Sequence, residues 1–361
     1  MTRLGGPVRV LVVDDSAVMR QLLSTLLSAD PDIEVVGTAS DPYIARERIK
    51  ALNPDVITLD VEMPKMDGLT FLHKIMTLRP TPVVMVSTLT QAGTEVTLEA
   101  LEIGAVDFVA KQTADAGREL FAAEIQTKVK AAAHTRVGVR RAAPVQSAPQ
   151  RTTRRAGNRI VFIGASTGGV EALKRLLVGI PADCPPILVT QHMPPRFTDA
   201  FAQRLNRELA MGVCEAKHDQ PVEPGNVYIA PGAHHLEIGR HGTHYRCVLS
   251  DEAPVSGHRP SVDVLFRSAA RLVGNAAVGV ILTGMGKDGA AGMLELRKTG
   301  AVTLGQDEES SLIYGMPRAA FDCGAVGQQF SLDRMASAIL DACERAVPPR
   351  AAVAGHSTDA A

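Results

Sequence analysis

The sequence predicts an α/β protein with a doubly wound parallel sheet in each half of the chain. Apolar, β-branched runs of strand length alternate with segments of helical spacing, which is the pattern of parallel sheets covered by helices. The length of 361 residues exceeds what one ordinary domain usually holds. A segment without apolar periodicity, rich in Ala, Pro, Ser, Thr and Arg, separates the two halves. We therefore expect two folded domains joined by a flexible linker.

The N-terminal half, residues 8–130, contains strand-like runs separated by helical patterns. The strand-like runs are residues 8–15, 33–40, 55–60, 82–88 and 105–111. Helical spacing is clearest at residues 16–29 and 43–52. Strands that alternate with helices in this way imply a five-stranded parallel sheet with helices on both faces.

The C-terminal half, residues 158–346, repeats this organisation on a larger scale. Its apolar runs of central-strand type are residues 159–166, 186–192 and 277–286. Helical patterns follow two of them, at residues 169–180 and 289–300. Shorter strands, expected at residues 226–230, 235–239 and 245–250, suit a hairpin or a sheet edge. This domain is predicted to be Rossmann-like, with residues 131–157 as the linker and residues 347–361 as a disordered tail.

Composition excludes several classes of protein. Hydrophobic residues make up 45% and charged residues 21%, which argues against a disordered chain, a collagen or a coiled-coil rod. The apolar runs are strand-sized and the N-terminus lacks the apolar core of a secretory signal, so we expect a cytoplasmic protein without membrane insertion. Five cysteines without a CxxC pair suit a reducing compartment and argue against disulfides or a cysteine zinc site.

Basic charge is concentrated around the predicted linker. Residues 128–158 contain eight Lys or Arg and no acidic residue, whereas the rest of the chain has 30 basic and 39 acidic side chains. Both predicted domains are therefore acidic, and neither offers the basic face that nucleic-acid binding requires. A transcription factor would also need a helix-turn-helix or a basic output domain, which residues 158–345 do not show.

Polar residues that suit phosphoryl chemistry lie at the ends of the predicted N-terminal strands. They are Asp14, Asp15, Asp60, Ser87 and Lys111. The carboxyl ends of parallel strands converge on one edge of a sheet, so these side chains are expected to meet there. Three crowded carboxylates need a counter-charge, which Mg²⁺ supplies because it prefers oxygen ligands. A lysine and a small hydroxyl would then hold a phosphoryl group on one carboxylate. Taken singly, each aspartate is also explained as a turn former.

The motifs that contain these residues resemble the response-regulator receiver domain. They are VVDDS, LDVEMPKMDG, VMVS and DFVAK, and the resemblance covers residues 8–128. It implies that Asp60 is the phospho-acceptor and that Ser87 and Lys111 contact the phosphoryl group. It also implies an Mg²⁺ site made by the carboxylates of Asp14, Asp15 and Asp60 and the backbone carbonyl of Glu62. The chain departs from the family at Gln112, where receivers usually have proline.

A predicted strand-to-helix turn in the C-terminal half presents a candidate nucleophile. Residues 164–168 fit the pattern G-x-S-x-G, with Ser166 at its centre, a strand before it and a helix after it. Such a turn exposes the serine hydroxyl and places free N–H groups of the helix start beside it. A phosphate-binding loop is the alternative, but the segment lacks the Walker lysine and the G-x-G-x-x-G spacing.

A base and an orienting acid for this serine are predicted at two other strand ends. His192 follows the strand at 186–192, and Asp288 lies in the turn after the strand at 277–286. The three side chains would meet at one sheet edge as nucleophile, general base and orienting acid. The backbone N–H groups of Thr167 and Met285 are candidate oxyanion donors.

Two alternatives concern other residues. A metal could bind the histidines at 234, 235, 241 and 244, and residues 259–263 could either line the cleft or cap the next helix.

Five further motifs resemble the CheB methylesterase family, in which a receiver is joined to a serine hydrolase. They are IGASTGG, QHMPPRFT, YIAPG, HRPSVDVLF and ILTGMGKDGAAGM, and the match extends over residues 8–345. The resemblance implies a triad of Ser166, His192 and Asp288 with no cofactor in the catalytic domain. It implies hydrolysis of glutamate γ-methyl esters and deamidation of glutamines on methyl-accepting chemotaxis receptors, with a CheA-type histidine kinase as phosphodonor.

Two rival functions follow from the same motifs. The first is a receiver-controlled serine hydrolase that acts on another ester or amide. The second is a scaffold without enzymatic activity, for which replacement of Ser166 would have no effect on receptor methylation. Labelling of Ser166 by a serine-directed probe distinguishes an enzyme from a scaffold.

Overall fold

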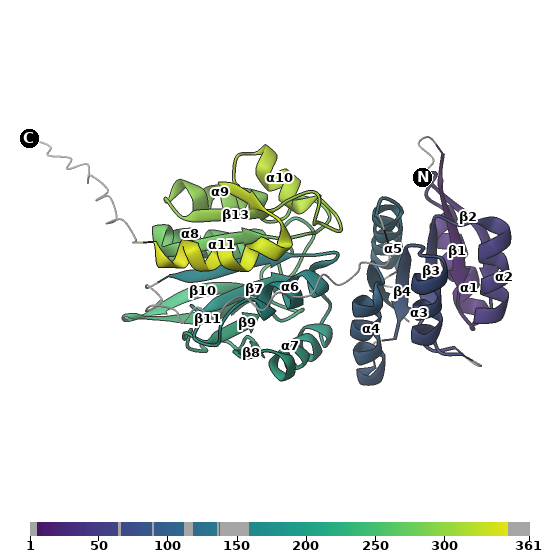
Figure 1. Cartoon of the computed structure of the whole chain (residues 1–361), viewed down its shortest axis with the longest axis horizontal. Coiled ribbons are helices and arrows are strands. Elements are labelled where there is room, and N and C mark those ends of the chain that lie inside the picture. Colours follow the sequence, from purple (N-terminus) through teal and green to yellow (C-terminus); the bar gives the residue numbers. More distant parts are fainter. Residues whose placement is uncertain are drawn as a thin grey trace, which may run out of the picture.

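The computed structural model describes residues 6–63, 66–88, 90–111, 118–135, 137 and 159–345. Its helices and strands form two α/β units, each built on a parallel sheet, which lie next to each other in Figure 1. The predicted α/β class with a parallel sheet in each half is therefore confirmed. Most of the predicted linker at 131–157 and the whole predicted tail at 347–361 lie outside the described residues.

The first unit is a five-stranded parallel sheet with the strand order β2-β1-β3-β4-β5. The strands are β1 (Val8–Val13), β2 (Ile33–Ala39), β3 (Val56–Asp60), β4 (Val83–Ser87) and β5 (Asp107–Ala110). The helices are α1 (Ala17–Ser28), α2 (Pro42–Leu52), α3 (Gly68–Leu78), α4 (Gln91–Ile103) and α5 (Arg118–Ala133). Strands β3 and β4 are buried at every position, because helices cover both faces of the sheet.

The second unit is a seven-stranded parallel sheet with the order β14-β13-β12-β6-β7-β9-β8. Its strands are β6 (Ile160–Ala165), β7 (Ile187–Gln191), β8 (Gly212–Glu215), β9 (Asn226–Ile229), β12 (Ala277–Ile281), β13 (Val302–Gln306) and β14 (Gln328–Phe330). The helices are α6 (Gly169–Val178), α7 (Phe197–Glu208), α8 (Val262–Leu272), α9 (Ala290–Lys298), α10 (Met316–Asp322) and α11 (Leu332–Glu344), with a 3₁₀ turn at Gly274–Ala276. The three neighbouring strands β12, β6 and β7 are completely buried.

The irregular middle of the second unit differs in part from the sequence expectation. Strands β10 (His235–His241) and β11 (His244–Ser250) form the expected antiparallel hairpin. The short strand expected at 226–230 instead joins the main sheet as β9, between β7 and the edge strand β8. The run at 226–230 is too short for its sequence to show that β9 has a neighbouring strand on each side. None of the described helices is both long and apolar enough to cross a membrane.

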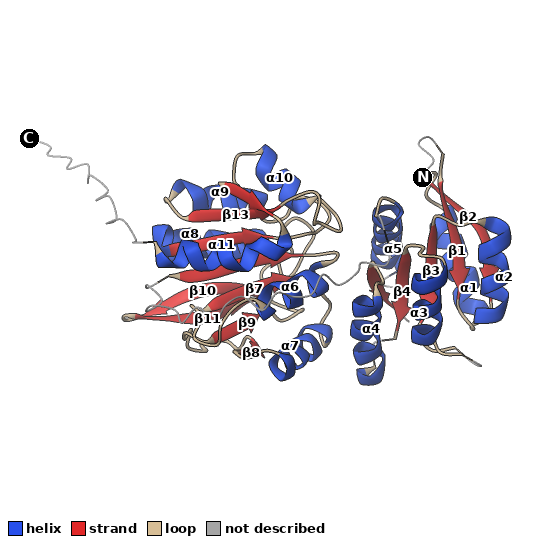
Figure 2. Cartoon of the chain, in the orientation of Figure 1, coloured by secondary structure: helices blue, strands red, loops and turns tan. Residues whose placement is uncertain are grey.

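Helix α4 of the first unit packs against helices α6 and α7 of the second (Figure 2). The first unit therefore packs on the side of the second unit that carries the loops after β6 and β7. The contacts made there are described below with the site.

Candidate catalytic and phosphorylation sites

Three neighbouring strands bring the predicted catalytic residues to one edge of the second sheet. Strand β6 lies between β12 and β7, and all three run parallel. Ser166 follows β6, His192 follows β7, and Asp288 lies in the loop after β12. Because the carboxyl ends of these strands point the same way, the three loops meet above the middle of the sheet.

The Asp288 carboxylate binds His192 and the start of helix α8 at the same time. Its Oδ2 lies 2.8 Å from His192 Nε2 and accepts the Val262 N–H at 2.7 Å. Its Oδ1 accepts the Ser261 hydroxyl at 2.8 Å and the Asp263 N–H at 3.1 Å. Burial favours the neutral acid, but the hydrogen bonds from His192 and from α8 hold the pKa of Asp288 below its usual range. Asp288 therefore remains a carboxylate that can orient the imidazole.

This arrangement answers the question that the sequence left open for residues 259–263. The segment both begins α8 and contacts the acid of the site, through the backbone of Val262 and Asp263. The Asp263 side chain itself accepts the Gly292 N–H at 2.7 Å and so joins α8 to α9. Asp263 therefore has a structural role.

The other imidazole nitrogen of His192 is free to act on the serine. His192 Nδ1 is buried and has no hydrogen-bond partner. No hydrogen bond between the Ser166 hydroxyl and His192 is formed among the described residues. Since Nε2 faces Asp288, Nδ1 is the nitrogen available to take a proton from Ser166 once the hydroxyl turns toward it.

His258 stacks on His192 and was not recognised as a site residue from the sequence. The two ring centroids lie 3.8 Å apart with an interplanar angle of 12°. Burial, together with the neighbouring His192, lowers the pKa of His258 to about 4. His258 is therefore neutral at pH 7 and covers one face of His192 without adding charge. Its place in the motif HRPSVDVLF was the only sequence signal, because stacking requires two loops that are distant in the chain.

The loop that carries Ser166 is held closely against the loop that follows β12. The Ser166 N–H donates to Thr283 O at 3.0 Å. A Cβ atom on Gly284 would lie 2.8 Å from the Ser166 Cβ, so only glycine permits this approach. The N–H groups of Thr167 and Met285, one in each loop, donate to no protein acceptor among the described residues. Both remain available to a ligand oxygen.

The histidines considered as an alternative metal site make other contacts. His234 Nδ1 pairs with the Asp251 carboxylate, while His235 Nδ1 accepts the Ser261 N–H and its Nε2 faces Ala253 O. His241 and His244 end the two strands of the exposed hairpin. Among the described residues, the only cluster of potential metal ligands lies in the first unit.

That cluster consists of the carboxylates of Asp14, Asp15 and Asp60, whose nearest oxygens lie within 4.8 Å of one another. Asp14 and Asp15 follow β1 and Asp60 ends β3, at the point where the strand order reverses. Lys111, after β5, places its Nζ 2.8 Å from Asp60 Oδ2 and 3.0 Å from Asp14 Oδ2. Burial, with the charge of Asp14 adding to it and Lys111 opposing it, raises the pKa of Asp60 to about 6.

The donor set of this cluster fits Mg²⁺. Three carboxylates supply hard oxygen ligands, and Asp15 and Glu62 line a hollow beside Asp60 through which an ion can enter. The Glu62 N–H lies 3.4 Å from Asp60 Oδ1, so the Glu62 backbone is next to the cluster. Gly68 permits the following turn, since a Cβ there would lie 2.3 Å from Asp60 O. Gln112, the departure from the family pattern, lies outside the described residues.

Ser87 contacts helix α4 rather than the aspartates. Its hydroxyl is fully buried and lies 3.2 Å from Gly93 O, in the first turn of α4. Among the described residues the hydroxyl makes no hydrogen bond to Asp60 or Lys111, although the Ser87 carbonyl accepts the Lys111 N–H at 2.7 Å. The structure thus links Ser87 to the helix that faces the second unit.

Strand β5 of the first unit contacts the residue that follows Ser166 and the start of α7, and Lys128 of α5 supports this strand. The hydroxyl of Thr167, the residue after Ser166, donates to Asp107 Oδ2 at 2.5 Å. Lys128 Nζ lies 3.3 Å from Asp107 Oδ1. The Phe108 ring stacks on Phe197, which begins α7 after the His192 loop, with centroids 4.3 Å apart. The first unit therefore covers the region next to the candidate nucleophile.

An ion-pair network joins α4 to the second unit. Glu102 Oε1 lies 2.7 Å from Lys174 Nζ on α6, and Glu102 Oε2 lies 2.5 Å from Arg204 on α7. Glu208 pairs with the same two cations. Sequence reasoning did not find these contacts, because charged residues on a helix surface have the same pattern whether they face water or another domain.

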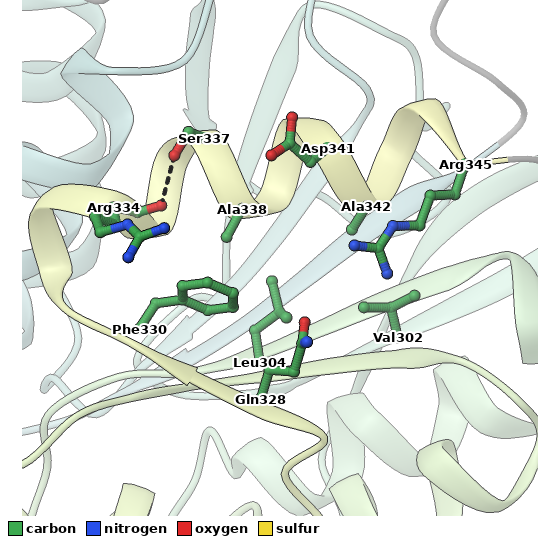
Figure 3. A pocket seen from close by; sticks show the side chains of 10 residues that line it. All are labelled: Val302, Leu304, Gln328, Phe330, Arg334, Ser337, Ala338, Asp341, Ala342 and Arg345. Atoms are coloured by element: carbon green, nitrogen blue, oxygen red, sulfur yellow. Dashed lines mark hydrogen bonds between the residues drawn. The ribbon is translucent and has the colours of Figure 1, made fainter.

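A second hollow lies far from these residues, between α11 and strands β13 and β14 (Figure 3). Its lining includes Leu304, Phe330, Arg334, Ser337 and Asp341. The Ser337 hydroxyl donates to Arg334 O within α11. None of the predicted site residues belongs to it.

Comparison with known proteins identifies relatives of both units. The family model described as CheB methylesterase matches residues 161–339, and that of the response regulator receiver domain matches residues 10–123. A relative from Dechloromonas aromatica, named protein-glutamate methylesterase/protein-glutamine glutaminase 1, is 56% identical over 92% of this chain and 98% of its own length. One of the same name from Caulobacter vibrioides is 59% identical over 92% and 97%. The CheB methylesterase catalytic domain of Thermotoga maritima is 34% identical, with a TM-score of 0.50 over 51% of this chain and 98% of that one.

Proposed function

Because the chain belongs to the CheB methylesterase family, we propose that Ser166, His192 and Asp288 perform the hydrolysis for which its relatives are named. The chain is a protein-glutamate methylesterase and protein-glutamine glutaminase, and its receiver domain makes it a phosphorylation-regulated enzyme of chemotaxis adaptation. A kinase as phosphodonor and chemoreceptors as substrates follow from the family in general.

The proposed reaction proceeds through an acyl-enzyme. Ser166 Oγ attacks the γ-carbonyl carbon of a receptor glutamyl methyl ester while His192 takes the hydroxyl proton. The oxyanion is stabilised by the N–H groups of Thr167 and Met285. His192 then protonates the departing methanol, and water, activated by His192, releases the glutamate carboxylate and restores Ser166. A glutamine side chain follows the same path, with ammonia as the leaving group.

The observation that carries this proposal is the Asp288 carboxylate, which binds His192 at 2.8 Å and is kept ionised by the start of α8. It is tested by methanol release from methylated receptor membranes, with and without a small phosphodonor, in parallel with labelling by a fluorophosphonate. We expect methanol release and labelling at Ser166 only. A labelled protein without methanol release would favour another ester or amide substrate, and no labelling would favour the scaffold.

We propose that Asp60 accepts the phosphoryl group in the first unit. Mg²⁺, when bound by Asp14, Asp15, Asp60 and the Glu62 carbonyl, would neutralise the charge that accumulates there. Lys111 supports this role, because its ammonium group already contacts Asp60. Ser87 would leave Gly93 O and donate to the phosphoryl group, which alters the first turn of α4.

We also propose that the unphosphorylated receiver restricts access to Ser166. The contact between Asp107 and Thr167 and the stack of Phe108 on Phe197 support this arrangement. A change in α4 would weaken the ion pairs of Glu102 and so favour release of the receiver. The proposed domains are a receiver at 8–130, a linker at 131–157 and a catalytic domain at 158–346, but helix α5 continues to Ala133, so the first three residues of the proposed linker are helical.

A fragment that starts near residue 158 is expected to demethylate receptors faster than the unphosphorylated full chain. A receptor helix bundle is too large to pass the receiver, whereas a small ester can reach Ser166 past a partial block. The rate on a small soluble ester should therefore differ less between the two proteins. Equal receptor rates without phosphodonor would contradict autoinhibition and assign phosphorylation another role, such as receptor docking.

Glu102→Gln is expected to raise the basal rate of receptor demethylation several-fold. The amide keeps the size of the side chain but loses the charge that pairs with Lys174 and Arg204. The arrangement in which the receiver restricts access to Ser166 therefore loses about 1 to 2 kcal/mol of stability. Glu99→Gln on the exposed side of α4 is the matched control and should leave the basal rate unchanged. If both variants behaved alike, the ion-pair network would have no part in regulation.

A further inference from the structure

Thr283 connects the two loops that carry the candidate oxyanion donors. It lies two residues after the end of β12 and two residues before Met285, and it is 1% exposed. Its backbone and hydroxyl together make hydrogen bonds to three separate segments of the chain, at residues 166–167, 306 and 313. No sequence pattern singled it out, because a threonine in the run ILTGMG is explained equally well as a strand residue.

Thr283 holds the Ser166–Thr167 segment on both of its sides. Its carbonyl accepts the Ser166 N–H at 3.0 Å. Its hydroxyl lies 3.0 Å from Thr167 O, to which it can donate. The peptide that bears the Thr167 N–H lies between these two contacts, so Thr283 helps to fix its orientation from both sides. The Ser166 carbonyl is held as well, by the Gly169 N–H and the Gln191 amide.

The same hydroxyl also fixes the loop that carries Met285. It accepts the Ile313 N–H at 2.9 Å, while Ile313 O accepts the Gly284 N–H at 3.1 Å. The Thr283 N–H donates to Gln306 Oε1 at 2.8 Å, and Gln306 is fully buried at the end of β13. The backbone on both sides of Thr283 is therefore anchored, which leaves little freedom for Gly284 and Met285.

We propose that Thr283 is a positioning residue, which fixes the Thr167 N–H relative to the Met285 N–H so that both can donate to one oxyanion. The proposal rests on the oxyanion donors of the proposed function. An oxyanion hole works only when its donors are held in place before charge develops, because reorganisation during the reaction costs activation free energy. Thr283 needs its hydroxyl for this, since valine has the same shape but cannot donate to Thr167 O or accept from Ile313.

The test compares Thr283→Val with Thr283→Ser in the full chain, with Mg²⁺ and saturating acetyl phosphate. Methylated receptor membranes are the substrate, and active sites are counted with a fluorophosphonate. We expect Thr283→Val to lower kcat about 10- to 100-fold with KM within twofold, and Thr283→Ser to restore most of the loss. Inhibition by a boronic acid, which forms a tetrahedral adduct on serine, should weaken in parallel with kcat. If Thr283 had a purely structural role, Thr283→Val would change thermal stability, but kcat and boronic-acid inhibition would not weaken together.

Thr190→Val is the matched control. Thr190 is also a fully buried threonine on a neighbouring strand, but its hydroxyl has no hydrogen-bond partner. Its replacement should leave kcat and boronate binding unchanged. If Thr283→Val failed to fold, Thr283→Cys, whose thiol is a weak donor, should show an intermediate kcat.

The inference would be overturned if Thr283→Val, or Thr283→Cys in its place, kept kcat within twofold of the parent, or if Thr283→Ser were as impaired as Thr283→Val. Ser166→Ala, assayed alongside, distinguishes a failure of the proposed function from a failure of the role proposed for Thr283. Full activity of Ser166→Ala would reject the proposed function itself. An inactive Ser166→Ala together with a fully active Thr283→Val would reject only the role of Thr283.

Discussion

Ser166→Ala, His192→Ala and Asp288→Ala are each expected to lower receptor demethylation by about three orders of magnitude or more. The three side chains act as one unit, so loss of any member removes most of what the unit contributes, and combined losses are not additive. The reason differs for each residue. In the proposed mechanism Ser166 supplies the nucleophile, His192 the base, and Asp288 the charge that orients and stabilises the imidazole.

The measurement is initial methanol release from methylated receptor membranes in the presence of a phosphodonor. Asp288→Asn separates charge from shape, because the amide can occupy the same place at the start of α8 without the charge that stabilises a protonated His192. Ser337→Ala, at an exposed serine on α11, controls for the loss of a hydroxyl. Near-complete kcat in Asp288→Ala would reject the triad, and another acid would have to be sought.

Asp60→Asn is expected to abolish acyl-phosphate formation and the activation that depends on it, while basal esterase activity remains. In the proposed function the Asp60 carboxylate oxygen accepts the phosphoryl group, and an amide cannot take its place. The neighbouring Lys111 would lose its partner at 2.8 Å but retain Asp14 at 3.0 Å, so the loop should keep its conformation.

The measurement is incorporation of radiolabel from a phosphodonor with Mg²⁺, together with the receptor demethylation rate. Asp32→Asn, an exposed carboxylate before β2, is the matched control and should be labelled like the parent protein. Radiolabel that persisted in Asp60→Asn would mean that a different side chain is phosphorylated. Loss of basal activity in Asp60→Asn would mean that the receiver supports catalysis even when it is unphosphorylated.

Local sequence was sufficient to predict the parallel sheets and the place of the candidate site residues. Strands β3, β4, β6, β7 and β12 are buried on both faces, so they appear as continuous apolar runs. A polar residue at the end of such a run has to lie at the carboxyl edge of the sheet. The edge strands β8 and β14 lacked this signal because they are short and partly exposed, and β13 lacked it because its run VTLGQ contains polar residues and a glycine.

Tertiary structure decided which groups those residues contact. The strand order placed β6 between β12 and β7, and only then could Asp288 reach His192 and the start of α8. It also directed Ser87 to Gly93 rather than to Asp60, and Thr167 to Asp107 of the other unit. Periodicity reports whether a side chain is buried, but it contains no information about the partner. A hydrogen bond between distant segments depends on how whole elements pack, and this is why Thr283, His258 and Glu102 emerged only from the folded chain.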